Sequence, residues 1–364
     1  MVLDDTPPDV PAVADTPEFP VRQAGADFFR GLFTIGTFGG EAKVYGQLSP
    51  TFQSVDDGVD DYVAALDNAN SQSRIGLISD IPIAESTLRL RAEFGLGPLK
   101  TNQINQSTEL SYTFWGDTYV RYFEAGLSGQ YGILTVGQGD MATQNAASND
   151  ASKTRVAGSV KIRNSAGGFL FRNADGTLSD VQIGDVFDSF NANRRIRALY
   201  SSPVWNGLNL SVAYGGDERS DSGTQTNYDA ALNYAGSFPD FDVNASVGMA
   251  IQEDDEGPRS RNYVGSVAVL HKPTGLNLSL AGGGIPDGAR YTYAKIGWTG
   301  DPLRTGFTAV AAEYYDGQDF LRSGTSSTAR GVMAVQGFED LSLETYVAYR
   351  EHSFSDPSSD PFRD

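Results

Sequence analysis

The sequence predicts an all-β fold: a transmembrane antiparallel β-barrel expected to have 16 strands, about 15 of which lie in this chain. Three observations predict it. Short segments alternate apolar and polar residues, short and long connections follow one another, and one long interval, 140–194, interrupts the series. No stretch approaches the roughly 18 apolar residues of a membrane helix, and a closed barrel is the other backbone that satisfies its hydrogen bonds in lipid.

The composition suits many strands and excludes several classes of function. The 364 residues include 17 Tyr, 20 Phe and 41 Gly but only 16 Pro, a mixture typical of strands separated by turns. Lys and Arg number 27 against 46 Asp and Glu, and the formal charge of -19 disfavours nucleic acid as a partner. Without Cys, the chain has no disulfide, thiolate metal site or catalytic thiol.

The chain divides into an N-terminal extension, 1–40, and a barrel, 41–364, that includes the long interval. The extension is Pro-rich and acidic at first and Gly-rich and apolar from Phe28, which predicts a flexible leader rather than a small plug. From Glu41 the period becomes two, and no later change in composition marks a second domain.

The segment 87–96 is the clearest predicted strand. Apolar residues at every second position alternate with Arg89, Arg91 and Glu93. Because an Arg near the middle of a lipid-facing surface costs roughly 2 to 4 kcal/mol, the apolar face meets lipid and the charged face meets the interior. Ten strand residues tilted near 45° span roughly 23 Å, close to the apolar band of about 25 Å on such barrels.

Short and long connections alternate along the rest of the chain. Turns such as 129–132, 202–207 and 272–275 join strands on one side, and long polar segments such as 97–118 join them on the other. This asymmetry is typical of outer-membrane barrels. Because an even number of strands closes a bacterial barrel, one closing strand is expected beyond Asp364.

Four segments carry a resemblance to a known family: Ser73–Leu77, the alternation Leu88–Phe94, Phe123–Asp140 and Arg197–Tyr214. They resemble the general Gram-negative porins, which are sixteen-stranded trimeric outer-membrane barrels with the third long loop folded into the pore. The resemblance covers roughly 41–350. The sequence departs from the family pattern in two ways. The closing strand with a terminal aromatic is missing, and the long interval lacks the family's usual short acidic helix motif.

The resemblance implies a water-filled channel for passive diffusion of ions and small hydrophilic solutes. It also implies a homotrimer in the outer membrane of a Gram-negative bacterium, surrounded by outer-membrane lipid and lipopolysaccharide. The interval 140–194 follows the fifth predicted strand, which is where the family places its constriction loop.

Charged residues at the narrowest point set selectivity in a water-filled pore. Parity places four basic residues on the lumen side of three consecutive strands: Lys43, Arg74, Arg89 and Arg91. They resemble the family's basic cluster, and Asp140 and Asp150 are the expected opposing acidic side. Four further charged residues are expected to project inward: Glu124, Arg197, Lys295 and Glu344.

The net charge predicts weak cation selectivity, because acidic loops at the mouth concentrate cations. Carboxylates of one such loop form a candidate Ca²⁺ site: Asp56, Asp57, Asp60 and Asp61. Their spacing lacks a recognised calcium-loop motif, so plain solvation is the simpler interpretation. No other cofactor is predicted.

Three alternatives stay open. A substrate-specific channel would line its pore with a track of aromatics or arginines, but the inward tyrosines form no obvious track, which favours a general pore. A hydrolase embedded in the barrel would need an activated Ser beside His271 or His352. An adhesin built as a β-sandwich is disfavoured by the charges inside nearly every strand. We therefore predict that the protein is not an enzyme.

Overall fold

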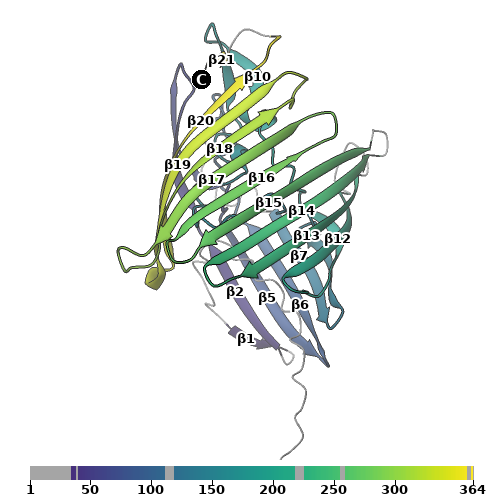
Figure 1. Ribbon diagram of the computed structural model, residues 1–364. Coiled ribbons are helices and arrows are strands. Elements are labelled where there is room, and N and C mark those ends of the chain that lie inside the picture. Colours follow the sequence, from purple (N-terminus) through teal and green to yellow (C-terminus); the bar gives the residue numbers. More distant parts are fainter. Residues whose placement is uncertain are drawn as a thin grey trace, which may run out of the picture.

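The structure is a computed structural model that describes residues 34–37, 40–110, 119–217, 225–254, 259–358 and 362–363. Residues 1–33, most of the predicted extension, lie outside this part. One sixteen-stranded antiparallel sheet curls around a lumen (Figure 1). Its strands in spatial order are β1 (Thr34–Thr37), β2 (Gly40–Gln47), β5 (Arg74–Ile83), β6 (Ser86–Gly95), β7 (Tyr119–Gly129), β8 (Gly132–Gly139), β11 (Arg195–Ser201), β12 (Leu208–Asp217), β13 (Gln225–Ser237), β14 (Phe241–Asp254), β15 (Ser260–His271), β16 (Leu276–Gly284), β17 (Arg290–Gly300), β18 (Thr308–Gln318), β19 (Ser326–Phe338) and β20 (Leu343–Ser355).

Two small sheets and three short helical turns complete the described elements. The first sheet is a hairpin of β3 (Pro50–Asp56) and β4 (Asp61–Asp67). The second contains β9 (Leu170–Asn173), β10 (Leu178–Gln182) and β21 (Phe362–Arg363). The helical turns are η1 (Ile162–Asn164), α1 (Ile183–Val186) and η2 (Glu339–Leu341). In the described part of the chain, no helix is long and apolar enough to cross a membrane.

All but one of the sixteen strands are those that the alternating pattern predicts. The exception is β1, which pairs with β2 from Thr34 opposite Lys43 to Thr37 opposite Gly40. The described part of the chain thus supplies sixteen strands to the sheet, one more than the sequence predicts, and the expected closing strand beyond Asp364 stays a prediction. A four-residue strand in a Gly-rich stretch has too little alternation to be recognised.

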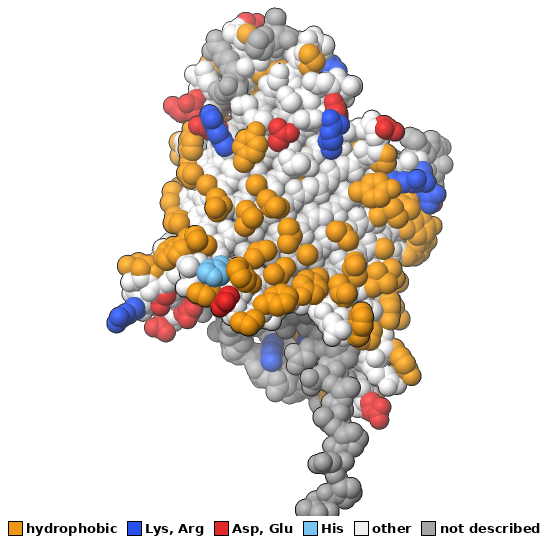
Figure 2. All heavy atoms as spheres, viewed as in Figure 1, with side chains coloured by type: hydrophobic (Ala, Val, Ile, Leu, Met, Phe, Trp, Pro, Cys, Tyr) orange, Lys and Arg blue, Asp and Glu red, His pale blue; other side chains and the backbone are white. Residues whose placement is uncertain are grey.

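The outer face of the barrel is apolar over the middle of its strands. On β5 and β6, Ile75, Leu77 and Leu90 are exposed on this face. Figure 2 shows hydrophobic side chains across the middle of the visible surface, with charged side chains gathered toward its upper and lower ends. An apolar band bordered by polar rims is the surface that a lipid bilayer requires of a barrel.

The interval 140–194, called the loop below, runs from the end of β8 to the start of β11 and folds into the barrel. It hydrogen-bonds the inward side chains of successive strands. The backbone N–H of Thr143 donates to Asp229 of β13 at 2.7 Å, and Asn149 Nδ2 donates to Ser266 of β15 at 3.0 Å. These contacts confirm the prediction that the long interval lies inside the barrel.

Aromatic packing fixes the second half of the loop against the inner wall of β17 and β18. Phe169, Val186 and Phe187 are almost fully buried in the largest apolar cluster. From the wall, Tyr291 and Tyr315 stack with ring centroids 5.1 Å apart. Because aromatic side chains bury large apolar areas, this cluster holds the loop to one side of the lumen.

Candidate functional site: the pore constriction

Charged residues on the inner faces of β5, β6 and β7 surround Glu93. Its Oε2 lies 2.8 Å from Nη2 of Arg91 and 3.8 Å from Nε of Arg74, and its Oε1 lies 2.6 Å from Nε of Arg121. The hydroxyl of Tyr45 on β2 donates to the same carboxylate at 2.6 Å. Glu93 is only 1% exposed. One buried carboxylate is thus shared by three arginines, and this group keeps a net positive charge.

Two further carboxylates extend the group to β11 and the loop. Arg197 Nη2 lies 2.5 Å from Glu124 Oε2, and Arg91 Nη1 lies 3.9 Å from Glu124 Oε1. At the two ends of the loop, Arg194 Nε lies 3.0 Å from Asp140 Oδ1. We call this set the constriction cluster: Arg74, Arg91, Arg121, Arg194, Arg197, Glu93, Glu124 and Asp140.

The ring of Tyr122 lies close to two of these guanidinium groups. Arg91 Cζ is 3.5 Å from the ring centroid, and Arg194 Cζ is 4.9 Å from it. The aromatic quadrupole attracts cations, so the ring offsets part of the repulsion between the arginines. At Gly139 a Cβ atom would lie 2.3 Å from Oε2 of Glu124, so glycine leaves the space that the ion pairs occupy.

A β-bulge places Arg121 inside the barrel. The register between β6 and β7 shifts after Glu93, which faces Tyr122, whereas Phe94 faces Val120. Arg121 is therefore the extra residue, and its side chain points inward together with that of Tyr122. Sequence reasoning missed Arg121 because strict alternation directs it at lipid. An arginine that faces lipid is energetically costly, and this cost was the one signal in the sequence that a bulge occurs here.

Two basic residues of the loop add positive charge: Lys161 lies near Arg194 and Asp140 of the cluster, and Arg155 lies near Lys161. Arg155 is exposed and Lys161 is half-buried. Burial, reinforced by the charges of Arg155 and Arg194, lowers the pKa of Lys161 to about 8. The carboxylate of Asp140 acts in the opposite direction. The loop has no periodicity, so the sequence contained no signal for the position of these two residues.

A buried ion pair anchors the loop to β17, away from the constriction cluster. Asp150 Oδ2 lies 2.8 Å from Nζ of Lys295 on β17, and the two side chains are 7% and 0% exposed. The same ammonium donates to Thr154 Oγ1 at 3.0 Å and to the carbonyl oxygen of Gly158 at 2.8 Å. The expectation that Asp150 forms the acidic side of the constriction is therefore wrong, because this carboxylate is buried and neutralised.

Comparison with known families assigns the chain. A family model described as Gram-negative porin matches residues 13–357. The chain belongs to the Gram-negative porin family. This porin is accordingly a protein of the outer membrane, as the sequence predicts. Comparison with curated protein sequences gave no match.

Several solved outer-membrane proteins are similar to this porin in fold. The anion-selective porin from Comamonas acidovorans is 16% identical with a TM-score of 0.59, over 89% of this chain and 92% of that one. A loop L8 deletion mutant of OmpT from Vibrio cholerae is 15% identical with a TM-score of 0.56, over 89% and 97%. Salmonella typhi OmpF, in complex with daunomycin, is 11% identical with a TM-score of 0.51, over 88% and 100%. At these identities the similarity shows the fold alone.

The four basic residues predicted for the constriction all belong to the inward faces of the porin's strands. Arg74 and Arg91 belong to the constriction cluster. Lys43 is exposed in the same transverse row as Arg91. Arg89 lies nearer the short turn between β5 and β6, where its Nε is 2.6 Å from Oδ1 of Asp80. The arginines are thus arranged at two depths, and a single ring does not contain them all.

The remaining predicted charges take different places in the porin. Glu124 and Arg197 pair within the cluster, whereas Lys295 anchors the loop. Glu344 is half-buried on β20, on the same face as Arg350.

The strand residue Glu313 was not predicted as a site residue, and it provides a further anchor for the loop. Its carboxylate accepts from Arg350 Nε at 2.8 Å, and the same guanidinium contacts Ser165 of the loop. Glu313 and Arg350 lie two strands apart in one transverse row, on either side of Gly331. A pairing of this kind leaves no trace in the local sequence pattern, so this anchor depends on the tertiary structure.

The acidic turn of the β3–β4 hairpin contacts an arginine of the loop. Arg172 Nη2 lies 2.8 Å from Asp57 Oδ2 and 3.2 Å from Asp60 Oδ2, and Asp56 accepts from a backbone N–H of its own turn. Within the described residues, no three His, Cys, Asp or Glu side chains are grouped so as to hold a metal ion. Calcium binding by these residues and Asp61 stays a prediction.

The two histidines lie in unrelated parts of the porin. His271 Nδ1 is 2.7 Å from Thr274 Oγ1 at a short turn. The ring of His352 packs against Phe187, with centroids 5.5 Å apart. Neither position is part of the constriction cluster.

Proposed function

We propose that this porin is a water-filled channel for passive diffusion of ions and small hydrophilic solutes. The observation that carries the proposal is the constriction cluster, a charged wall inside the barrel next to a loop that is anchored on the opposite side. Charged and polar groups at the narrowest part of a lumen keep it hydrated and act directly on passing solutes. We propose no enzymatic activity.

We propose that the constriction of this channel prefers anions, in place of the weak cation selectivity that the net charge predicts. Five arginines in the cluster face three carboxylates, each of which is ion-paired. Lys161 adds a positive charge near Arg194 and Asp140, and Arg155 adds another near Lys161. The net charge of -19 favours cations at the mouths, but nearby charges dominate the field where the pore is narrowest.

The assembly proposed for the channel is a homotrimer, surrounded by outer-membrane lipid and lipopolysaccharide. One of the solved OmpT structures is described as a trimer form of that protein. In this arrangement each barrel carries its own constriction.

Insertion of the purified full-length protein into planar bilayers tests the channel. We expect conductance to rise in steps that group in threes, because three pores enter together. Electrophoretic mobility before and after boiling in SDS provides the folding control. Folded, inserted protein that conducts no ions would contradict the proposed function.

Raising the pH from about 6.5 to about 9.5 is expected to weaken the anion preference. Lys161 carries its charge below its pKa of about 8 and loses it above that value, whereas an ordinary lysine titrates near pH 10.4. Reversal potentials at several pH values measure the effect. Lys161→Gln is expected to abolish this pH response and Lys153→Gln, on the same loop, to retain it. An unchanged pH response in Lys161→Gln would show that another group titrates.

A further inference from the structure

Lys161 is a half-buried lysine of the loop whose ammonium group lacks a direct partner. Its neighbours Val160 and Ile162 are buried in the largest apolar cluster, so the side chain of Lys161 leaves the loop on the opposite side, toward the lumen. Its backbone N–H donates to Ser159 at 3.3 Å, but no described residue hydrogen-bonds or ion-pairs with its Nζ atom. Partial burial of an unpaired charge is costly, and a bound anion would remove that cost.

Hydrogen bonds hold this part of the loop beside the arginines of the constriction cluster. Ser159 Oγ donates to Asn70 Oδ1 at 3.1 Å, in the turn that precedes β5. Two residues further along this turn, Gln72 Oε1 accepts from Arg121 Nη1 at 2.8 Å. The turn thus connects the loop to Arg121 and fixes the position of the lysine relative to the cluster.

The charges nearest Lys161 are mostly positive. Burial has the largest effect in lowering the pKa of Lys161, and the charges of Arg155, Arg194 and Arg121 lower it further. The carboxylate of Asp140 acts in the opposite direction, but it is ion-paired with Arg194 at 3.0 Å. The lysine therefore lies in a positive field that one carboxylate, already paired, does not cancel.

The constriction has enough surplus charge to hold a doubly charged anion. Its cluster contains five arginines and three carboxylates, which is a surplus of two positive charges, and Lys161 adds a third. A dianion interacts with each of these charges about twice as strongly as chloride does. Guanidinium groups match the oxygens of phosphate in geometry, and lysine binds phosphate as a point charge.

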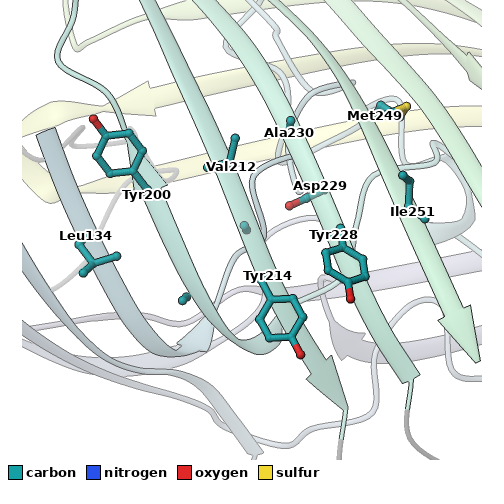
Figure 3. Close-up of a pocket in the computed structure, with 11 residues that line it drawn as sticks. Leu134, Tyr200, Val212, Tyr214, Tyr228, Asp229, Ala230, Met249 and Ile251 are labelled. Carbon is teal, nitrogen blue, oxygen red and sulfur yellow. The ribbon is translucent and has the colours of Figure 1, made fainter. Parts of the chain in front are cut away.

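Arg121 retains a donor for such a ligand. Its Nε donates to Glu93 Oε1 at 2.6 Å and its Nη1 to Gln72. Within the described residues, Nη2 of Arg121 has no hydrogen-bond partner. By contrast, the apolar hollow in the outer face of the barrel, across β8 and β11 to β14 (Figure 3), contains no Lys or Arg in its lining and offers an anion no such partner.

We propose that Lys161, Arg121 and Arg194 form a binding site for a dianionic phosphate group, carried by free phosphate or by a phosphate monoester. Arg121 provides donors from the wall, Arg194 from the end of the loop, and Lys161 from its middle. This inference rests on the proposed channel function and adds to it a saturable site. A phosphate that occupies the site obstructs chloride until it leaves.

Channel current in potassium chloride with increasing inorganic phosphate at pH 7 tests the site. Phosphate is expected to reduce the current of the wild-type porin to a saturating level. Lys161→Gln is expected to raise the half-blocking concentration roughly tenfold, because a dianion loses one strong charge interaction. Lys161→Arg keeps the charge and is expected to retain most of the block. Lys153→Gln is the matched control, because Lys153 lies over the ring of Phe307 at 4.6 Å, outside the site.

Two further solutes identify the group that binds. Block by glycerol 3-phosphate as well as inorganic phosphate would show that monoesters enter the site, whereas block by inorganic phosphate alone would limit the ligand to the free ion. Succinate has the same charge spread over two separated carboxylates and is expected to block more weakly. Equal block by succinate, or equal block of the wild type and Lys161→Gln by phosphate, would overturn the proposal.

Thermal unfolding of the folded porin tests the site without conduction. A ligand that binds only the folded state raises the melting temperature. Phosphate is expected to raise it relative to chloride at equal ionic strength in the wild type and in Lys153→Gln, but not in Lys161→Gln. The same shift in all three proteins, or no shift in the wild type, would contradict the site. Failure of the phosphate site and failure of the channel are thus distinguishable.

Discussion

Replacing Lys295 with methionine is expected to lower the free energy of unfolding by roughly 3 to 5 kcal/mol, the usual cost of leaving one partner of a buried ion pair alone. Asp150 would remain almost fully buried without its counter-charge. The loop would also lose the hydrogen bonds from the ammonium to Thr154 and Gly158. Denaturant titration of the folded barrel in lipid measures the change in stability.

The matched control for this variant is Lys272→Met. Lys272 pairs with Asp242 at 3.5 Å near a short turn, where both side chains are about one-third exposed. An exposed pair of this kind contributes roughly 0 to 1 kcal/mol. A further variant, Lys295→Met with Asp150→Leu, is expected to recover much of the stability because no buried charge is left. If Lys295→Met costs no more than Lys272→Met, the ion pair does not anchor the loop.

Arg91→Gln is expected to shift ion selectivity toward cations by roughly two- to fivefold in the permeability ratio. A unit charge about 4 Å from an ion in water contributes about 1 kcal/mol, which sets the upper end of this range. Arg91 belongs to the constriction cluster, and the ring of Tyr122 lies close to both Arg91 and Arg194 of the loop. Reversal potentials under a salt gradient measure the shift.

Arg89→Gln is the comparison variant, because it removes the same charge from the same face of β6. Arg89 is paired with Asp80 nearer the short turn and lies outside the constriction cluster. Its substitution is therefore expected to change the reversal potential less than that of Arg91. Equal shifts in the two variants would indicate that selectivity depends on the total charge of the lumen.

Alternation along the strands was enough to predict the faces of the barrel and much of the basic wall. It placed Arg74, Arg91 and Arg197 inside because lipid excludes charge from the opposite face. It failed for Arg121, where a β-bulge adds a residue and interrupts the period of two. Local irregularities of this kind reverse the parity on which such predictions rest.

The loop could be located from the sequence, but the positions of its side chains could not. Asp150 was expected to face the arginines. Its carboxylate instead pairs with Lys295 on the barrel wall and is buried there. Lys161 was not predicted at all, although Arg194 and Asp140 of the constriction cluster act on its pKa, and neither was Arg155, whose charge also acts on Lys161. In an aperiodic segment, pairing with a distant wall decides the direction of each side chain.

The reversal potential of the wild-type porin in a planar bilayer under a potassium chloride gradient tests the central claim most directly. The two ions have similar mobilities in water, so the sign of the potential reports the charge of the constriction. The excess of arginine and lysine over carboxylates at the constriction predicts a preference for chloride. A clear preference for potassium would contradict this account and would mean that the net charge of -19 determines selectivity.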